Sequence, residues 1–230
     1  MTASASEMQV NLNESKQASL RTLLIAALVT PTIVVFFRVW SRALLPVSPT
    51  SNIKSRFWWD DYTVLAAAII NIVISVIGLK LVDLGLGLHI EAIPPGNIDY
   101  LLKLLWFTYV LFDWGSTLAK ASAIFFYIRI LGAASSRFKT SLWLLHGLNL
   151  LWLVVILIVT LLLCSPIEKN WNTTVPGRCI NPTTLWLGNG ASGLVIDLII
   201  LFIPLPVLWG LQMKLSRKLQ TTVVFLVGYM

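Results

Sequence analysis

The sequence predicts an all-α fold, a bundle of helices that cross a membrane several times. Of the 230 residues, 57% are hydrophobic and only 12% are charged, and the mean hydropathy is +0.82, far more apolar than an ordinary soluble domain. Apolar runs recur at lengths that can cross roughly 30 Å of hydrocarbon. Basic residues gather in alternate short loops without forming one patch. This excludes a nucleic-acid partner and makes the lipid bilayer the expected surroundings.

Five complete spans and part of a sixth follow a polar tail. Residues 1–19 lack the basic start and apolar core of a signal peptide, and we expect them to form an outer tail. Residues 20–230 form the predicted transmembrane bundle, with spans at about 20–37, 62–82, 100–130, 142–163 and 185–209. A sixth at 221–230 would rise only about 15 Å as a helix, about half a bilayer. We therefore expect a truncated sixth span from a seven-span parent.

The distribution of charge predicts the orientation. The connections after spans one, three and five carry ten basic residues and two acids, whereas the other side carries six of each. The positive-inside rule then places the amino terminus outside, in a multi-pass protein of the plasma membrane more readily than of internal membranes. The two N-x-S/T sequons, at Asn13 and Asn172, both fall on the predicted outer side and are candidate glycosylation sites.

The only two cysteines bracket one predicted outer loop. In an oxidising compartment Cys164 and Cys179 would close a loop of about 16 residues, which contributes roughly 3 kcal/mol. The alternative is a pair of free thiols.

The third predicted span carries polar side chains at a fixed interval. Trp106, Asp113, Lys120 and Tyr127 are spaced by seven residues, close to two helical turns, so they stack along one face. Charged groups inside a span are costly unless they face a bundle interior and find partners. This stripe is therefore expected to face other helices.

Asp197 in the fifth span is the expected partner of this stripe. Counting about 1.5 Å per residue from the inner basic residues places Asp113 and Asp197 at similar depth, with Lys120 about 10 Å deeper but leaning toward both. We predict a mid-membrane cluster of Asp113, Lys120 and Asp197 that a ligand or a proton could disturb. The alternative is a buried ion pair that only fixes the register of two helices.

Two further sets of residues are candidates at the ends of the spans. Asp60 and Asp61 begin the second span, where they either cap the helix or pair with Arg38 and Arg42 and fix span one against span two. His89 follows the second span and is either an outer-loop site residue or an ordinary solvated side chain. We expect no metal site and no cofactor.

Several linked segments carry a family resemblance. They are FFRVWSR, WWDDY, GLGLHI, KASAIFFYIRI, CSPIEKNWNTTVPGRC and IDLIILFIPLPVLWGLQMKLSRK. In order and spacing the chain resembles, over about residues 20–230, the fungal rhodopsin-domain integral membrane proteins, which include receptor-like pathogenicity proteins and membrane proteins of the satratoxin cluster type. The resemblance implies a seven-span receptor-like architecture. It gives weight to Arg38, Arg42, Asp60, Asp61, Gly87, His89, Lys120, Tyr127, Arg129, Cys164, Cys179, Asp197 and Pro204.

The chain departs from the family in three respects. The 19-residue tail has no cysteine, so we expect this chain to lack the Cys-rich outer domain of some receptor-like members, and we expect it to lack the seventh span. Leu88 stands where the family often has a basic residue, which argues against an anion-binding role for that loop.

Three functions remain open. The first is receptor-like sensing of a small external ligand, with a cytoplasmic signalling protein as partner. Against it, residues 100–106 contain no cysteine that could tie the third span to the outer loop, as rhodopsin-like receptors do. The second is an accessory membrane protein or transporter of a secondary-metabolite pathway. The third is an intramembrane enzyme using Asp113 and Asp197 as acid and base. Since no other catalytic or metal motif is present, we expect no enzyme.

Overall fold

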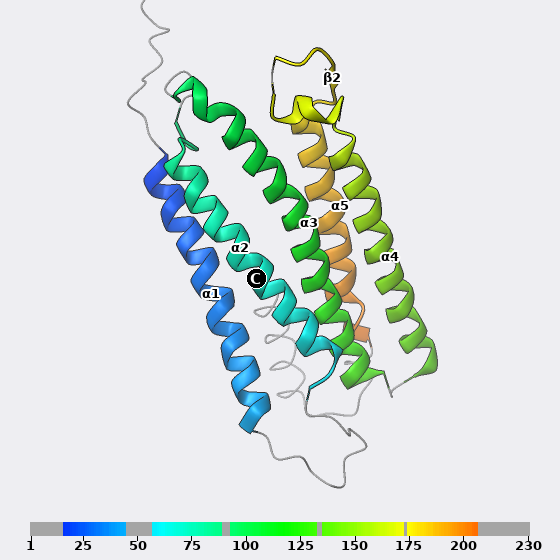
Figure 1. Ribbon diagram of the computed structural model, residues 1–230. Helices are drawn as coiled ribbons and strands as arrows, with labels where there is room; N and C mark the ends of the chain where they lie inside the picture. Colours follow the sequence, from blue (N-terminus) through cyan, green and yellow to red (C-terminus); the bar gives the residue numbers. More distant parts are fainter. Residues whose placement is uncertain (1–15, 45–56, 89–92, 133–134, 173, 207–230) are drawn as a thin grey trace, which may run out of the picture.

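The computed structural model describes residues 16–44, 57–88, 93–132, 135–172 and 174–206, and this part of the chain is a bundle of long helices (Figure 1). Their bounds are Gln17–Leu44 for α1, Trp59–Asp83 for α2, Pro95–Leu131 for α3, Ser136–Leu161 for α4 and Pro182–Phe202 for α5. Helices α1, α3 and α5 run in one direction and α2 and α4 in the other (Figure 1). The predicted all-α membrane bundle is confirmed.

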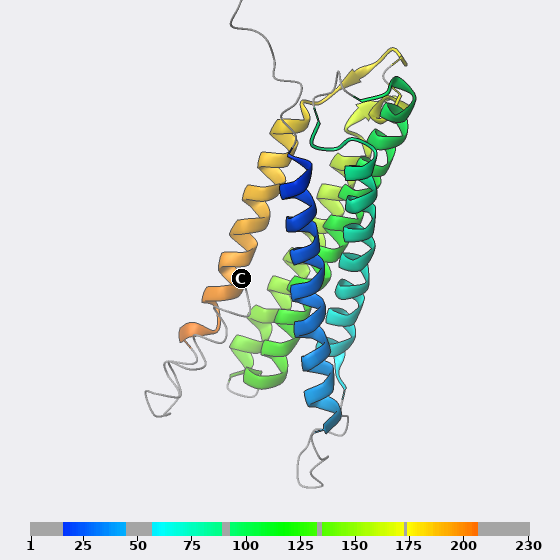
Figure 2. The same ribbon diagram turned by 90° about the vertical axis from the view of Figure 1, so that its left-hand side faces the viewer.

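Within the described residues, α1, α2, α4 and Thr183–Phe202 of α5 are long and apolar enough to cross a membrane. Helix α3 is longer still, with 37 residues that rise about 55 Å, but charges interrupt its apolar run. It lies between α2 and α4 (Figure 1) and also contacts α5. Helix α1 packs mainly against α2 (Figure 2). Helix α3 is therefore the centre of the bundle.

Helix starts and ends differ from the expected spans for local reasons. Helix α3 begins five residues before position 100, at Pro95, because proline suits the first turn of a helix. Asn181 caps α5, its side chain accepting a hydrogen bond from the Thr183 backbone N–H at 3.0 Å. Helix α5 ends at Phe202. The end of the predicted fifth span, 207–209, and the predicted sixth span, 221–230, lie outside the described residues.

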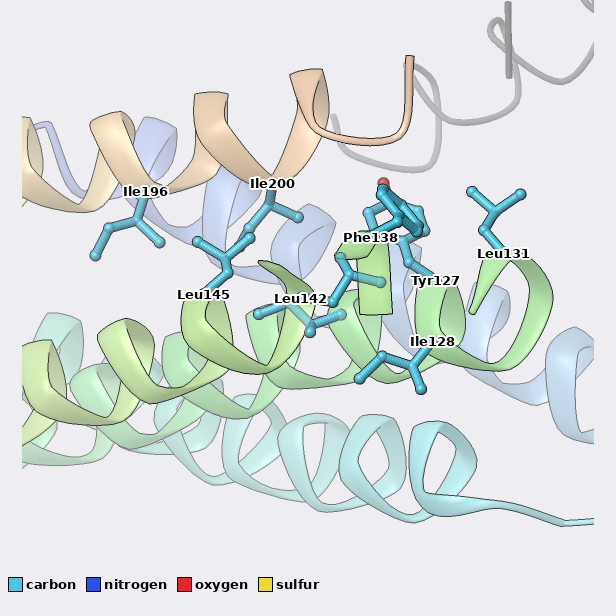
Figure 3. Packing of buried hydrophobic residues seen from close by; sticks show 9 residues of the cluster. Tyr127, Ile128, Leu131, Phe138, Leu142, Leu145, Ile196 and Ile200 are labelled. Atoms are coloured by element: carbon cyan, nitrogen blue, oxygen red, sulfur yellow. The ribbon is translucent and has the colours of Figure 1, made fainter. Parts of the chain in front are cut away.

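The best-packed core lies between one half of α3, the start of α4 and the end of α5 (Figure 3). It consists of Ile124, Tyr127, Ile128, Leu131, Phe138, Leu142, Leu145, Ile196 and Ile200. Many large apolar side chains on the outside of the bundle are exposed, and no residue of α1 is buried. Outward-facing apolar side chains suit a bundle solvated by lipid.

The connection between α4 and α5 is a short hairpin. Strand β1, Cys164–Ser165, pairs with strand β2, Arg178–Cys179, in antiparallel fashion, and a 3-10 helix, Ile167–Asn170, lies between them. Cys164 and Cys179 form the predicted disulfide. The hairpin caps one end of the bundle (Figure 1).

Candidate functional site

The four polar residues of α3 do face neighbouring helices. Trp106 Nε1 donates a hydrogen bond to the Thr160 carbonyl of α4 at 3.3 Å. Asp113 and Lys120 contact α5, and Tyr127 lies in the apolar core with only 2% of its surface exposed. The seven-residue spacing thus places one stripe against α4 and α5.

Lys120 has three neighbours at the middle of the bundle. Its ammonium lies 3.3 Å from Asp197 Oδ1, donates to Ser116 Oγ at 2.8 Å and sits 5.0 Å from the Trp152 ring centroid. The side chain leans back one helical turn to reach Ser116, as helical side chains tend to do. The lysine side chain is 7% exposed and that of Asp197 is 31% exposed, so the pair opens to the surroundings from the α5 side.

Asp113 lies in a separate contact. Its carboxylate Oδ1 accepts a hydrogen bond from Asn189 Nδ2 at 3.1 Å. Asp113 is 1% exposed, and within the described part of the chain its Oδ2 and the Asn189 Oδ1 are buried without a hydrogen-bond partner. At the α3–α5 contact, these two acceptors thus have no donor within hydrogen-bond geometry among the described residues, and the nearby Thr160 side chain of α4 and the Lys120 charge also act on the Asp113 carboxylate.

Counting residues along the helices predicted that Asp113 and Asp197 lie at similar depth in the membrane. This prediction is wrong. Asn189, which reaches Asp113, lies eight residues before Asp197, or about 12 Å along the helix. The count assumed an unbroken helix down to Lys214, whereas α5 ends at Phe202. The expected three-residue cluster is thus two successive contacts between the same pair of helices.

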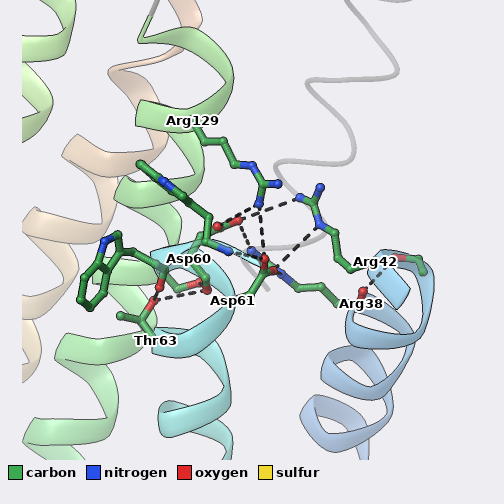
Figure 4. Close-up of polar contacts among 10 residues, drawn as sticks. Arg38, Arg42, Asp60, Asp61, Thr63 and Arg129 are labelled. Carbon is green, nitrogen blue, oxygen red and sulfur yellow. Dashed lines mark hydrogen bonds and ion pairs between the residues drawn. The ribbon is translucent and has the colours of Figure 1, made fainter. Parts of the chain in front are cut away.

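A second ionic cluster lies at the opposite end of the bundle from the disulfide (Figures 1 and 4). Arg38 donates to Asp60 Oδ2 at 2.8 Å and to Asp61 Oδ1 at 3.3 Å. Arg129 Nη1 donates to Asp60 Oδ1 at 3.2 Å and to Asp61 Oδ2 at 3.3 Å. Arg42 stands 3.9 Å from both carboxylates. Figure 4 shows the arginines of α1 and α3 converging on the two aspartates of α2.

Both roles predicted for Asp60 and Asp61 occur in the structure: Asp61 caps the start of α2, and both aspartates pair with arginines. Asp61 Oδ2 accepts a hydrogen bond from the Trp58 backbone N–H at 3.3 Å, which caps the start of α2. Asp60 and Asp61 are 0% and 1% exposed, and a carboxylate so buried needs close cations. The arginines of α1 and α3 supply them, so this cluster joins three helices.

Arg129 is the member that sequence reasoning did not place here. A signal for it exists in the spacing of α3. Ser122 Oγ donates to the Asp60 backbone carbonyl at 2.8 Å, and a side chain on Gly115 would stand 3.1 Å from Ile70 of α2. Gly115, Ser122 and Arg129 are seven residues apart, so they form a second stripe, and this one faces α2.

The structure gives little information on three other candidate site residues. Asn13 and His89 lie outside the described residues. Asn172 is half-buried, and its side-chain oxygen accepts a hydrogen bond from the Thr174 backbone N–H at 3.1 Å; its glycosylation stays a prediction. No group of three His, Cys, Asp or Glu side chains suited to a metal ion occurs among the described residues.

The bundle and its buried ion contacts define a multi-pass helical membrane protein. Comparison with known proteins gives the family: the fungal rhodopsin domain matches residues 37–230. The chain belongs to this family, as the linked sequence segments predict.

Three relatives illustrate the similarity. A SAT4 family membrane protein of Emericella nidulans is 29% identical over 179 residues, 77% of this chain and 44% of the relative. Wortmanamides biosynthesis cluster protein C of Talaromyces wortmannii is 25% identical over 77% of this chain and 50% of its own length. Satratoxin biosynthesis SC1 cluster protein 4 of Stachybotrys chartarum is 30% identical over 49% of this chain and 42% of its own. The chain thus spans at most about half the length of these curated relatives. No solved structure matches it.

Proposed function

We propose that this chain is a receptor-like membrane protein that binds a small ligand at the contact between Asp113 and Asn189. The observation that carries the proposal is the pair of buried acceptors, Asp113 Oδ2 and Asn189 Oδ1, which lack a partner within the described residues. Leaving a buried polar atom unpaired costs about 1–3 kcal/mol, and more for a charged one. A bound ligand that supplied the missing hydrogen bonds would recover this energy.

The chemistry of the two atoms selects the class of ligand. A carboxylate oxygen and an amide oxygen both accept hydrogen bonds, so the ligand must donate them. The nearest cation on the same stripe, Lys120, is engaged by Ser116 and Asp197. A small amine or hydroxyl compound therefore fits, and a carboxylate does not.

The ligand would enter from the end of the bundle that carries the disulfide, which we place outside the cell. A disulfide forms and persists in an oxidising compartment, and Cys164 and Cys179 form one at this end. The opposite end carries the basic residues that the positive-inside rule assigns to the cytoplasm. The amino terminus is then outside.

A ligand at this contact could act on the far end through α3. Asp113 and Arg129 belong to the same helix, and Arg129 holds both aspartates of α2. A small shift of α3 against α5 would change the geometry of that ion cluster, because packed interfaces switch between discrete arrangements. A cytoplasmic signalling protein would read this change.

The experiment measures thermal unfolding of the purified full chain in lipid nanodiscs by tryptophan fluorescence. The probes are short alkylamines, alcohols and carboxylates of matched size. Amines and alcohols should raise the melting temperature, and Asp113→Asn should remove the amine response. Asp99→Asn changes an exposed acid on the same helix and should leave it intact. Equal stabilisation by carboxylates, or an unchanged response of Asp113→Asn, would refute the site.

A second function is supported by the names of two relatives. Both the wortmanamides protein and the satratoxin protein are named for biosynthesis clusters, which favours an accessory membrane protein or transporter in a secondary-metabolite pathway. A biosynthetic cluster beside the gene, with loss of its product on deletion, would support this function. An unchanged product level would count against it.

A further inference from the structure

The ion cluster of α1, α2 and α3 contains one positive charge more than it needs. Three arginines surround two aspartates. Arg38 and Arg129 together donate to all four carboxylate oxygens at 2.8 to 3.3 Å. The two carboxylates are therefore neutralised and hydrogen-bonded without Arg42.

Arg42 is the uncommitted member. Its two contacts with the aspartates are both 3.9 Å long, beyond the range of a hydrogen bond. It donates no hydrogen bond to any other described residue, whereas Arg38 also lies 5.6 Å from the centre of the Phe126 ring. An arginine presents five N–H donors in a rigid fork, so the Arg42 fork is available to an anion.

The exposure of the three arginines shows where that anion would bind. The Arg129 side chain is 10% exposed, while those of Arg42 and Arg38 are 24% and 28% exposed. The two partly exposed arginines lie on α1, one turn apart, at the end of a helix that can cross a membrane. The excess charge thus faces outward at the level where a spanning helix leaves the membrane.

The neighbouring surface of α1 is apolar. Val34, which is 60% exposed, lies one turn before Arg38 on the same face of α1. A molecule with an anionic head and a long apolar chain would contact both surfaces. A guanidinium binds a phosphate through two parallel hydrogen bonds, and basic groups at membrane ends attract anionic lipids.

We propose that Arg42, assisted by Arg38, binds the phosphate of an anionic phospholipid whose acyl chain lies along α1 beside Val34. The lipid supplies the negative charge that the cluster lacks and attaches the end of α1 to the bundle. This inference goes beyond the proposed function and does not depend on it.

The test uses the purified full chain in neutral detergent and measures binding by native mass spectrometry. The probes are phosphatidylserine, phosphatidylcholine and inorganic phosphate. Phosphatidylserine should bind in preference to phosphatidylcholine at one saturable site. A charge-assisted hydrogen bond corresponds to about tenfold or more in affinity, so Arg42→Gln should weaken phosphatidylserine binding by at least that factor.

The matched control is Arg137→Gln. Arg137 is an exposed basic residue at the start of α4, at the same end of the bundle and outside the cluster, and its replacement should change binding by less than twofold. Arg42→Lys keeps the positive charge but loses the paired N–H donors of the guanidinium. Its affinity for phosphatidylserine should lie between that of Arg42→Gln and that of the native chain.

Three results would overturn the proposal. Equal loss in Arg42→Gln and Arg137→Gln would show diffuse attraction to charge. Equal binding of phosphatidylserine and phosphatidylcholine by the native chain would exclude a site selective for anionic lipid. This comparison does not depend on the folding of any variant. Inorganic phosphate that displaces the lipid at similar concentration would show a site for a free anion.

Discussion

The ion pair between Lys120 and Asp197 gives the most direct test of how α3 is held against α5. A double-mutant cycle with Lys120→Met and Asp197→Asn removes each charge while keeping most of the side-chain volume. Because the two groups lie 3.3 Å apart, the two changes together should destabilise the chain less than the sum of the single changes. The double variant leaves no unpaired charge from this pair.

The magnitude follows from the burial of the two side chains. Removing one partner of a buried ion pair costs about 3–5 kcal/mol, because it leaves the other charge uncompensated. Asp197→Asn leaves the ammonium of Lys120, which is 7% exposed. Since Asp197 itself is 31% exposed, water or headgroups reach the site and favour the lower limit, about 3 kcal/mol. The coupling energy should then be about 1–3 kcal/mol.

The assay is unfolding in mixed micelles with increasing sodium dodecyl sulfate, followed by far-UV circular dichroism. The control cycle is Arg21→Met with Asp83→Asn, an ion pair in which both side chains are 54% exposed and for which coupling below about 1 kcal/mol is expected. Additive effects at Lys120 and Asp197, within about 0.5 kcal/mol, would show that the pair does not hold α3 to α5.

Three further predictions concern other parts of the bundle. Asp60→Asn should destabilise the chain by about 3–5 kcal/mol, because it unbalances a buried ion cluster; Asp83→Asn, on the same helix but exposed, should cost less than about 1 kcal/mol in the same unfolding assay. Cys164→Ser should cost roughly 3 kcal/mol, and a reducing agent should lower the melting temperature of the native chain only. Gly78→Leu should destabilise by about 1–3 kcal/mol, because a Cβ there would lie 2.8 Å from a leucine side chain of α1. Gly147→Leu, with nothing within 4 Å, should have little effect on the unfolding midpoint.

The sequence predicts the helices well because lipid imposes a simple requirement. A spanning segment must bury its backbone polar groups in its own hydrogen bonds and expose apolar side chains, so hydropathy and length reveal it. The hairpin at Cys164–Ser165 and Arg178–Cys179 could not be read in the same way. Its strands have two residues each, too few for any alternating pattern to appear.

The partners of the buried charges could be predicted only in part. A spacing of seven residues identifies which side chains of α3 share a face, and it correctly groups Asp113 with Lys120. It does not give the axial position of α5, which depends on where that helix ends. Asp197 is therefore the expected partner of both residues, whereas nothing in the spacing identifies Asn189, the residue that contacts Asp113.

Arg129 shows that a single helix can carry two functional stripes. Lys120 and Arg129 are nine residues apart, which places them on opposite faces of α3. One face meets Asp197 of α5, and the other meets the aspartates of α2. A helix with charges on opposite faces must have partners on both sides, so Lys120 and Arg129 together indicate that α3 is central.

The missing cysteine at the start of α3 also finds a physical explanation. The hairpin loop contacts α3 through Trp171, whose ring lies 5.7 Å from that of Trp106 and 5.7 Å from the Lys103 ammonium. Each such aromatic or cation–π contact contributes about 0.5–1.5 kcal/mol, less than a disulfide but without covalent restraint. The disulfide therefore closes the loop on itself, and aromatic contacts hold it to the helix.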